Sequence, residues 1–473
     1  MSDGGETNTS YIPAARLLEL YEWKTLSPVD VVKDALARIG AVNDAVNAYC
    51  HIDEDGALKA ARASEERWMR GEPSGLTDGI PVSVKDLLLT KGHTARRGSK
   101  ATPEHAPERF DAPSVARLRE HGAVIIGRTT TPEYGWKGLT DSPLTGISRN
   151  PWDTSKTPGG SSGGAAISAA LGMAPLNIGT DGGGSVRIPA GFTGVFGLKP
   201  TFGRVPVYPP SAMGTLSHAG PLTRTVEDAA IMMNVMVQPD PRDWHATPYD
   251  PWDFRTGLDL GVRRLAVAFS ANLGYVDVDP EIAAIVADAA QVLADQGAEI
   301  EETDPGFDDP KDMFDSHWNL GASRLVDSFS AEQQAQMDPG LLDVAERGRA
   351  LTLAQYADAM DARVDLGRRM NLFFETFDLL VTPALPIAAF AVGQNVADPA
   401  SQSDWTEWTP FSYPFNLTGH PACVVPCGFT KAGLPVGMQI VGPRYADPLV
   451  MRAAGAFEQV RPFKMPDAPN ITH

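Results

Sequence analysis

Short apolar runs alternate with segments of helical periodicity along most of the chain. Ile80–Val84 and Ala123–Ile126 have the apolar character of buried strands, and Ser114–His121 between them has helical spacing. The same patterns predict helices at Gly163–Leu171, Val226–Met236 and Pro280–Gln296, and strands at Leu265–Phe269, Ala298–Glu302, Leu379–Thr382, Ala422–Val425 and Met438–Val441. Such alternation predicts an α/β fold with a mixed, largely parallel central sheet covered by helices on both sides.

Two regions depart from this alternation because they are mainly helical. In residues 1–70, Ser27 and Pro28 are typical of a helix start, and a second helix is expected over Gly56–Arg70. Residues 311–375 are the other helical region. Pro239–Arg255, rich in Pro, Asp and Trp, is either a linker or a surface loop. Strands are expected on both sides of it, so we predict one large domain over 1–473, with a helical region at 1–70, a catalytic core at 71–236 and the remaining sheet and pocket helices at 256–473.

Composition is that of a soluble globular protein. Of the 473 residues, 43% are hydrophobic and 21% are charged. Met1–Ser10 is polar and acidic, unlike a secretory signal. The longest apolar stretch, Ala165–Ile178, is too short and too interrupted to span a bilayer. These features predict a cytoplasmic protein that does not insert into a membrane.

The net charge and the cysteine content argue against several classes of partner and site. The formal net charge is −19 and no Lys/Arg-rich run occurs, which argues against a nucleic-acid partner. Three cysteines cannot form a disulfide framework and fit a reducing compartment. His420, Cys423 and Cys427 lie close enough in sequence to suggest a metal site. The segment Cys423–Cys427 has the apolar character of a buried strand, however, so we predict no metal there.

The most distinctive local feature is a pair of glycine-rich segments that each contain serine. Residues 157–164 read T-P-G-G-S-S-G-G, and residues 179–189 read G-T-D-G-G-G-S-V-R-I-P. A flexible linker is disfavoured because the sequence between them is apolar and helix-forming. A phosphate-binding loop is disfavoured because neither segment matches a known phosphate-loop pattern.

The first segment also satisfies G-x-S-x-G, the nucleophile elbow of α/β-hydrolases. That elbow must follow a strand directly, yet residues 153–158 are polar and end in proline. A catalytic histidine would also be required downstream, and no histidine after Ser161 has neighbouring residues that indicate a catalytic role. The later histidines are His218, His245, His317, His420 and His473. We therefore do not assign Ser161 as the nucleophile of such an elbow.

Lysine as the base for a serine nucleophile fits the sequence better. Lys85 ends the apolar run Gly79–Val84, where burial would favour the neutral amine. To act as a base near neutral pH, its pKa must fall from ~10.4 by roughly three units, which costs about 4 kcal/mol. Taken alone, Lys85 could equally form a salt bridge with Asp86 or lie at the surface. Its combination with the two serine segments favours the catalytic interpretation.

Together these segments resemble the amidase signature family. The resemblance rests on G-I-P-V-S-V-K-D at 79–86, on both glycine-rich segments, and on G-L-K-P-T-x-G-R-V-P at 197–206, and it resumes at 416–419 and 433–437. It implies that Lys85 is the base, Ser161 the proton-relaying serine after a cis Gly160–Ser161 bond, and Ser185 the nucleophile. The resemblance also implies an oxyanion hole formed by the backbone N–H groups of Gly182, Gly183, Gly184 and Ser185. No metal or organic cofactor is implied.

Two positions differ from the family pattern. Gly182 stands where the family commonly has threonine or another side chain, and we expect a looser oxyanion loop. Ala165 replaces a frequent serine or glutamate, and we expect only indirect effects on hydrogen bonding.

The resemblance predicts hydrolysis of a small amide, with ester or carbamate substrates also compatible. Aromatic candidates for an apolar pocket, favouring aryl groups, are Tyr134, Trp136, Trp318, Phe411 and Tyr413. One alternative is the glutamine-hydrolysing subunit of an amidotransferase, which is disfavoured because residues 318–324 lack that subunit's usual segment. A non-catalytic binding protein would require loss of a key residue, and all three are present. A homodimer remains open.

Overall fold

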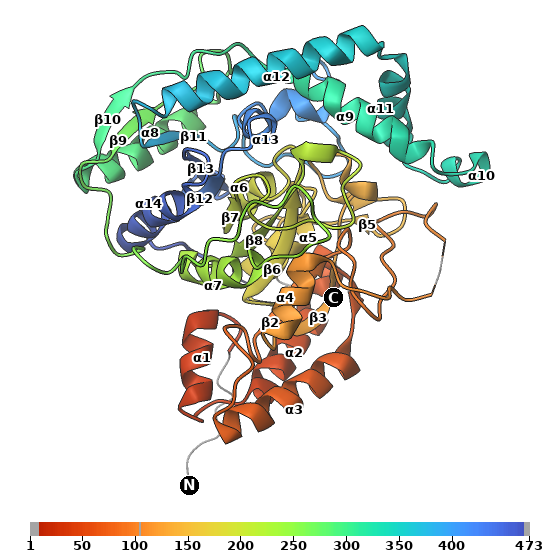
Figure 1. The fold of residues 1–473 in the computed structure, drawn as a ribbon, viewed down its shortest axis with the longest axis vertical. Coiled ribbons are helices and arrows are strands. Elements are labelled where there is room, and N and C mark those ends of the chain that lie inside the picture. The colour runs from red at the N-terminus through yellow and green to blue at the C-terminus, as the bar shows by residue number, and fades with distance from the viewer. Residues whose placement is uncertain (1–8, 104–105, 468–473) are drawn as a thin grey trace.

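The computed structural model describes residues 9–103 and 106–467, and an eleven-stranded sheet forms its centre (Figure 1). In spatial order the strands are β1 (Tyr49–Ile52), β3 (Val124–Thr129), β2 (Pro81–Lys85), β6 (Leu176–Asp181), β8 (His218–Thr223), β7 (Phe196–Lys199), β12 (Ala422–Phe429), β13 (Pro435–Val441), β11 (Leu379–Pro383), β9 (Ala266–Phe269) and β10 (Glu299–Glu302). A separate two-stranded sheet contains β4 (Asp141–Ser142) and β5 (Gly146–Ile147). His473 and most of the Met1–Ser10 segment lie outside the described residues.

The central sheet is mixed, and its parallel pairings fall into two groups. Strands β3, β2 and β6 pair in parallel, as do β11, β9 and β10. The pairings from β6 through β8, β7, β12 and β13 to β11 are antiparallel, as is the pairing of β1 with β3. The predicted α/β class and mixed sheet are confirmed. Strands β7 and β12, from either side of 239–255, pair directly, so that segment is a loop beside one continuous sheet.

Helices cover both faces of the sheet and both ends of the molecule. The α-helices are α1 (Ala14–Glu22), α2 (Pro28–Val46), α3 (Glu54–Arg70), α4 (Pro113–Glu120), α5 (Gly163–Ala170), α6 (Arg187–Thr193), α7 (Val226–Met236), α8 (Pro280–Asp295), α9 (Lys311–Val326), α10 (Ala331–Gln334), α11 (Pro339–Ala350), α12 (Leu353–Phe373), α13 (Tyr413–Leu417) and α14 (Asp447–Val460). The short 3₁₀ helices are η1 (Glu133–Gly135), η2 (Gly214–Leu216) and η3 (Trp405–Trp408). Helices α1–α3 lie at the opposite end of the molecule from α9, α11 and α12 (Figure 1). Among the described residues, no helix has the length and apolarity needed to cross a bilayer.

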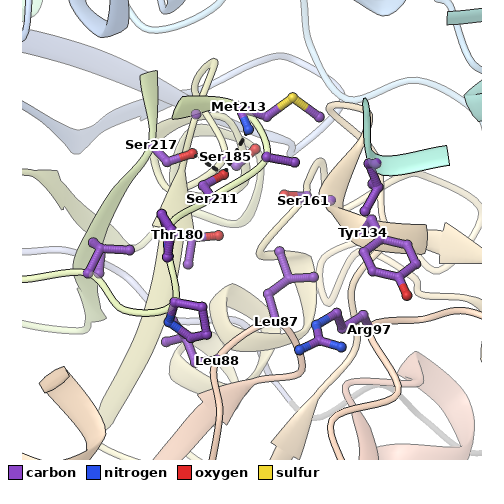
Figure 2. A pocket seen from close by; sticks show the side chains of 18 of the residues that line it. Leu87, Leu88, Arg97, Tyr134, Ser161, Thr180, Ser185, Ser211, Met213 and Ser217 are labelled. Atoms are coloured by element: carbon purple, nitrogen blue, oxygen red, sulfur yellow. Dashed lines mark hydrogen bonds between the residues drawn. The ribbon is translucent and has the colours of Figure 1, made fainter. Parts of the chain in front are cut away.

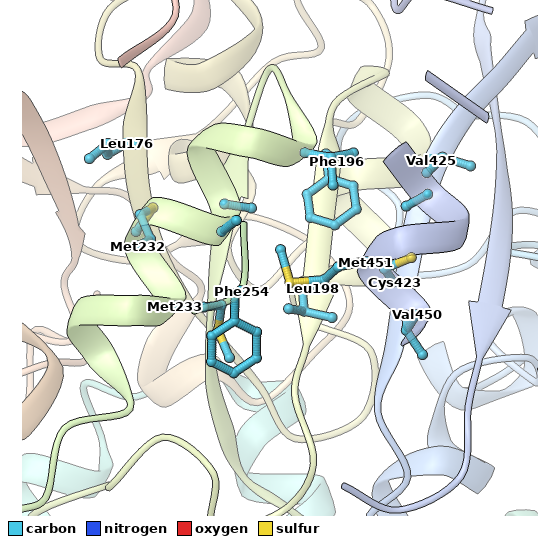
Figure 3. Packing of buried hydrophobic residues seen from close by; sticks show 14 of the residues in the cluster. Leu176, Phe196, Leu198, Met232, Met233, Phe254, Cys423, Val425, Val450 and Met451 are labelled. Carbon is cyan, nitrogen blue, oxygen red and sulfur yellow. The ribbon is translucent and has the colours of Figure 1, made fainter. Parts of the chain in front are cut away.

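Alternating side chains of β12 fill the core on the two faces of the sheet. Cys423 and Val425 belong to the largest apolar cluster, together with residues of α7, α8 and α14 (Figure 3). Val424, between them, packs in a second cluster with residues of α5 and α6. Successive residues of a strand point to opposite faces, so β12 is buried on both sides. Cys423 is therefore a core residue, as its apolar neighbours in the sequence predicted.

Most of the expected helices and strands are present within one to four residues of their predicted ends. Sequence reasoning missed the strands β1, β4, β5, β6, β7 and β8 and the helices α6, α13 and α14. Strand β8 contains Gly220 and Pro221, residues that usually argue against a central strand. It forms nevertheless, between β6 and β7, with Pro221 opposite Ile178. Long-range pairing thus overrides the local preference of these residues.

Candidate active site

Parallel pairing of β2 with β6 places the ends of these two strands at the same edge of the sheet. Val84 pairs with Ile178, so the next residue of β2, Lys85, lies beside the end of β6. The side-chain nitrogen of Lys85, Nζ, is 2.9 Å from the hydroxyl oxygen of Thr180. Lys85 is completely buried, although it is a strand-end residue with a long side chain. The sheet topology therefore fixes the amine inside the protein.

The segment before α5 brings Ser161 to this amine. Lys85 Nζ lies 2.7 Å from Ser161 Oγ and 2.8 Å from Ser162 Oγ. The Gly160–Ser161 peptide bond is cis, which confirms the prediction for this bond. A Cβ atom at Gly160 would overlap the backbone of Leu139, so close packing as well as bond geometry requires glycine there. Sequence reasoning did not identify Ser162 or Thr180 as contacts of the lysine.

The hydrogen bonds of Ser162 orient the lysine. Ser162 Oγ donates to the carbonyl oxygen of Thr180 at 3.1 Å, so it must accept from Lys85. Thr180 Oγ1 is a second acceptor for the amine. A neutral lysine has two N–H groups and one lone pair. If the two N–H groups point to Ser162 and Thr180, the lone pair faces Ser161.

Burial lowers the pKa of Lys85 well below its usual value, because an ammonium group is poorly solvated in the interior. The nearby carboxylate of Asp181 acts in the opposite direction and raises this pKa, but burial is the larger effect. The arrangement therefore favours the neutral amine, the form that can accept a proton.

The loop after β6 carries Ser185 and is held by Asp181. One carboxylate oxygen of Asp181 accepts from the Gly184 amide at 2.8 Å, and the other accepts from the Val186 amide at 3.2 Å. Gly184 has φ of +120°, a conformation that strongly favours glycine. Because its N–H is bonded to Asp181, the prediction that Gly184 donates to an oxyanion is not supported by this geometry. The amides of Gly182, Gly183 and Ser185 are the remaining candidates.

Asp181 is in turn held by a buried network that sequence reasoning missed. Arg187 donates to both carboxylate oxygens of Asp181, each at 3.0 Å, and to the side-chain oxygen of Asn416 at 2.6 Å. Burial alone would raise the pKa of Asp181, but Arg187 and Lys199 outweigh it and the net shift is downward. A signal was present in the second glycine-rich segment, which contains an aspartate and an arginine six residues apart on either side of Ser185.

Ser161 and Ser185 both line a cavity of about 450 Å³ (Figure 2). Thr180 and Gly182 line it near the two serines. Most other lining residues are apolar or uncharged. They include Leu87, Leu88, Val207, Pro209, Pro210, Ala212, Met213, Leu325 and Phe329. The structure thus brings the three predicted residues to one place, with the two serines open to the cavity and the lysine behind them.

The predicted aromatic residues divide into two groups. Tyr134 and Trp318 line the cavity, as expected. Trp136, Phe411 and Tyr413 do not, because each is packed in the core beside it. Trp136 contributes indirectly, since its carbonyl oxygen accepts a hydrogen bond from the Trp318 indole at 3.1 Å. Sequence alone cannot separate a lining aromatic residue from one that packs a single layer behind it.

Within residues 9–103 and 106–467, no three His, Cys, Asp or Glu side chains are arranged to hold a metal ion. Cys423 and Cys427 are fully buried in β12, and burial raises the pKa of both thiols. His218 does line the cavity, and burial lowers its pKa well below the usual value. Burial therefore favours the neutral form of this imidazole.

Comparison with known proteins gives consistent matches over nearly the whole chain. The Amidase family model matches residues 30–451. An acylamidase from Rhodococcus erythropolis is 34% identical over 97% of both chains. A glutamyl-tRNA(Gln) amidotransferase component from Chloroflexus aggregans is 34% identical over 92% of this chain and 93% of its own.

Solved structures agree with these sequence matches. A bacterial aryl acylamidase of the amidase signature family superposes with a TM-score of 0.90 at 32% identity, covering 96% of each chain. A 6-aminohexanoate cyclic dimer hydrolase in complex with its substrate gives a TM-score of 0.88 at 26% identity, covering 98% of this chain and 100% of its own.

Proposed function

The chain belongs to the amidase signature family, and on that basis we propose that it hydrolyses the C–N bond of small apolar or aryl amides through an acyl-enzyme on Ser185. The observation that carries this proposal is the contact of a buried, pKa-lowered Lys85 with Ser161, which shares a cavity with Ser185. A serine hydroxyl becomes an effective nucleophile only when a base removes its proton during attack.

In the proposed acylation step, Ser185 Oγ forms a bond to the substrate carbonyl carbon. Its proton passes to Ser161, and the Ser161 proton passes to the lone pair of Lys85. The negative charge on the carbonyl oxygen is stabilised by the amides of Gly182, Gly183 and Ser185. Each well-placed donor of this kind contributes about 3 kcal/mol in the transition state.

Collapse of the tetrahedral intermediate breaks the C–N bond. Ser161 gives its proton to the leaving nitrogen and recovers one from Lys85, so the amine departs neutral. Water then attacks the acyl-enzyme by the same proton route, releasing the carboxylic acid and restoring Ser185. Esters and carbamates can follow this route because only the leaving atom or the acyl substituent differs.

Two observations support an apolar or aryl substrate. The cavity wall is formed mainly by aliphatic and aromatic side chains, including Trp318 and Phe329, which suit a ring or alkyl group. The similar proteins include an acylamidase and an aryl acylamidase.

The amidotransferase components in the comparison support a second candidate, hydrolysis of glutamine within a complex. Among the described residues that line the cavity, no aspartate or glutamate is present to bind the ammonium group of glutamine, so the match to this zwitterion is poor. Ammonia release from free glutamine at a rate exceeding that of any anilide would favour this second candidate.

The test is turnover of a panel of 4-nitroanilides by the purified protein and by Ser185→Ala. We expect the substitution to lower kcat by at least about 1,000-fold. Ser401→Ala, which changes an exposed loop serine, serves as the matched control. A slowly deacylating nitrophenyl ester followed by peptide mass mapping should place the acyl group on Ser185. An acyl group on Ser161, or full activity of Ser185→Ala, would refute the assignment.

A further inference from the structure

Arg97 is the one arginine or lysine among the described residues that line the catalytic cavity. It lies in the loop between β2 and α4, on a wall otherwise made of apolar and uncharged side chains. Figure 2 shows its guanidinium group beside Tyr134 and Leu87. The proposed reaction uses Lys85, Ser161 and Ser185 and gives Arg97 no task. A half-buried cation in such surroundings is poorly solvated, and an anionic partner would stabilise it.

Two carboxylates near Arg97 already have other partners: Asp86, which accepts from the Gly98 amide, and Glu133, which precedes Tyr134. Asp86 pairs with Arg128 at 2.7 Å, within the interior. Glu133 accepts hydrogen bonds from the Ser99 hydroxyl and the Asp338 amide. Across the described residues, no carboxylate lies within salt-bridge distance of Arg97. Within residues 9–103 and 106–467, the structure therefore places a cation on the cavity wall and pairs it with no carboxylate.

The position of Arg97 is fixed by its backbone and by Tyr134. Arg97 has φ of +55°, a left-handed conformation that is unusual for a residue with a side chain. Its carbonyl oxygen accepts from the Tyr134 amide at 2.8 Å, and its guanidinium carbon lies 5.9 Å from the centre of the Tyr134 ring. The Tyr134 hydroxyl is bonded to Thr102 at 2.6 Å. A side chain held in this way is suited to recognising one group on a ligand.

We propose that Arg97 binds a carboxylate carried by the substrate, and that the preferred amides place an apolar spacer between this carboxylate and the scissile C–N bond. The inference rests on the proposed amidase function and narrows its substrate class. Guanidinium groups bind carboxylates through two parallel hydrogen bonds, which provide both affinity and orientation. The apolar wall between Arg97 and the serines would contact the spacer.

The test compares two pairs of amides whose members differ at one group, which is a carboxylate in one member and uncharged in the other. Glutaryl and pentanoyl 4-nitroanilide place the charge difference on the acyl side, and 4-acetamidobenzoate and 4-acetamidobenzamide place it on the amine side. Each pair is assayed with the wild type, Arg97→Gln, Arg97→Lys and the control Lys100→Gln, which removes an exposed positive charge nearby.

We expect the wild type to prefer the carboxylate in one pair by about 10- to 100-fold in kcat/KM, mainly through KM. Arg97→Gln should remove this preference and leave the neutral amide within about twofold. Arg97→Lys should keep part of the preference, and Lys100→Gln all of it. Equal rates within both pairs for the wild type, or an equal loss for both members in Arg97→Gln, would overturn the proposal.

A binding measurement separates this inference from the proposed function. Calorimetric titration of the wild type and Arg97→Gln with 4-phenylbutyrate and with 4-phenyl-1-butanol, which has no C–N bond to hydrolyse, does not depend on turnover. If no anilide is hydrolysed, the function fails, but tighter binding of the carboxylate that is lost in Arg97→Gln still supports the Arg97 site. If anilides are hydrolysed and both ligands bind both proteins equally, the function stands and the Arg97 site is refuted.

Discussion

The backbone N–H of Ser162 donates a hydrogen bond to the carbonyl oxygen of Ser185, with nitrogen and oxygen 3.1 Å apart. The side chain of Ser162 contacts Lys85 at 2.8 Å. One residue therefore connects the buried amine to the loop that carries the proposed nucleophile. The two glycine-rich segments form a single unit because each supplies one partner of this hydrogen bond.

Replacement of Ser162 tests the orientation of the lysine. Ser162→Ala keeps the backbone bond to Ser185 but removes one of the two acceptors that direct the lone pair of Lys85 toward Ser161. We expect kcat to fall about 10- to 100-fold with little change in KM, because general-base catalysis depends on this alignment. Ser83→Ala removes a buried hydroxyl from β2 that bonds Asn177, and it serves as the control. Equal kcat values for the two variants would contradict the orienting role.

The pH dependence of activity tests the protonation state of Lys85. Because burial lowers its pKa, the neutral base should be present well below the ordinary lysine value of ~10.4. We therefore expect kcat/KM for a neutral anilide to rise with pH and to level off in the range where free lysine is still protonated. If kcat/KM instead continued to rise up to the pKa of free lysine, the pKa of Lys85 would not be lowered.

The lowered pKa of Lys85 should also make the stability of the folded protein depend on pH. Between the lowered pKa of the folded state and the ordinary pKa of the unfolded state, only the unfolded chain binds the Lys85 proton. The free energy of unfolding of the wild type should therefore rise with pH in this window, relative to Lys85→Met. Below the folded-state pKa both states are protonated and the difference is constant. Urea denaturation of both proteins from pH 6 to 10 measures this difference in the free energy of unfolding. If the difference did not change with pH, the pKa of Lys85 would not be lowered in the folded state.

Trp318 occupies the space that a side chain at position 182 would need. A Cβ on Gly182 would lie 3.0 Å from the Trp318 ring, which explains why glycine stands where the family commonly has a larger residue. We expect Gly182→Thr to lower kcat/KM by about 10- to 100-fold through displacement of the oxyanion loop. Trp318→Leu in the same chain should restore part of this loss. Independent, additive effects in the double variant would show that the two residues are not coupled.

Arg187 should be essential for stability because it neutralises the buried carboxylate of Asp181. Arg187→Met leaves that carboxylate without its cation and should lower the free energy of unfolding by about 3–5 kcal/mol. The deficit should shrink as pH falls, since the wild type loses the benefit of its lowered Asp181 pKa as the carboxylate becomes protonated. Arg349→Met, which breaks an exposed pair with Asp327, should cost less than about 1 kcal/mol. Similar losses in both variants, measured by urea denaturation, would argue against the buried network.

The local sequence was sufficient to propose candidate site residues wherever a residue's chemistry depends on its neighbours in the chain. Lys85 at the end of an apolar run, and Ser161 and Ser185 among glycines, could be proposed as site residues from their sequence neighbours, and the family resemblance supplied the proposed roles. The cis Gly160–Ser161 bond was implied by the family resemblance and is present. The α/β class followed from the alternation of periodicities over the whole chain.

Only the tertiary structure decided which groups are available at the site. Asp181 engages the Gly184 amide, so a residue expected in the oxyanion hole shapes the loop instead. Trp136 and Phe411 pack behind the cavity, whereas Trp318 and Arg97 line it. The sequence determines the kind of residue and its local backbone preference. Desolvation, hydrogen-bond partners and access to the cavity depend on segments hundreds of residues apart, and folding alone brings these together.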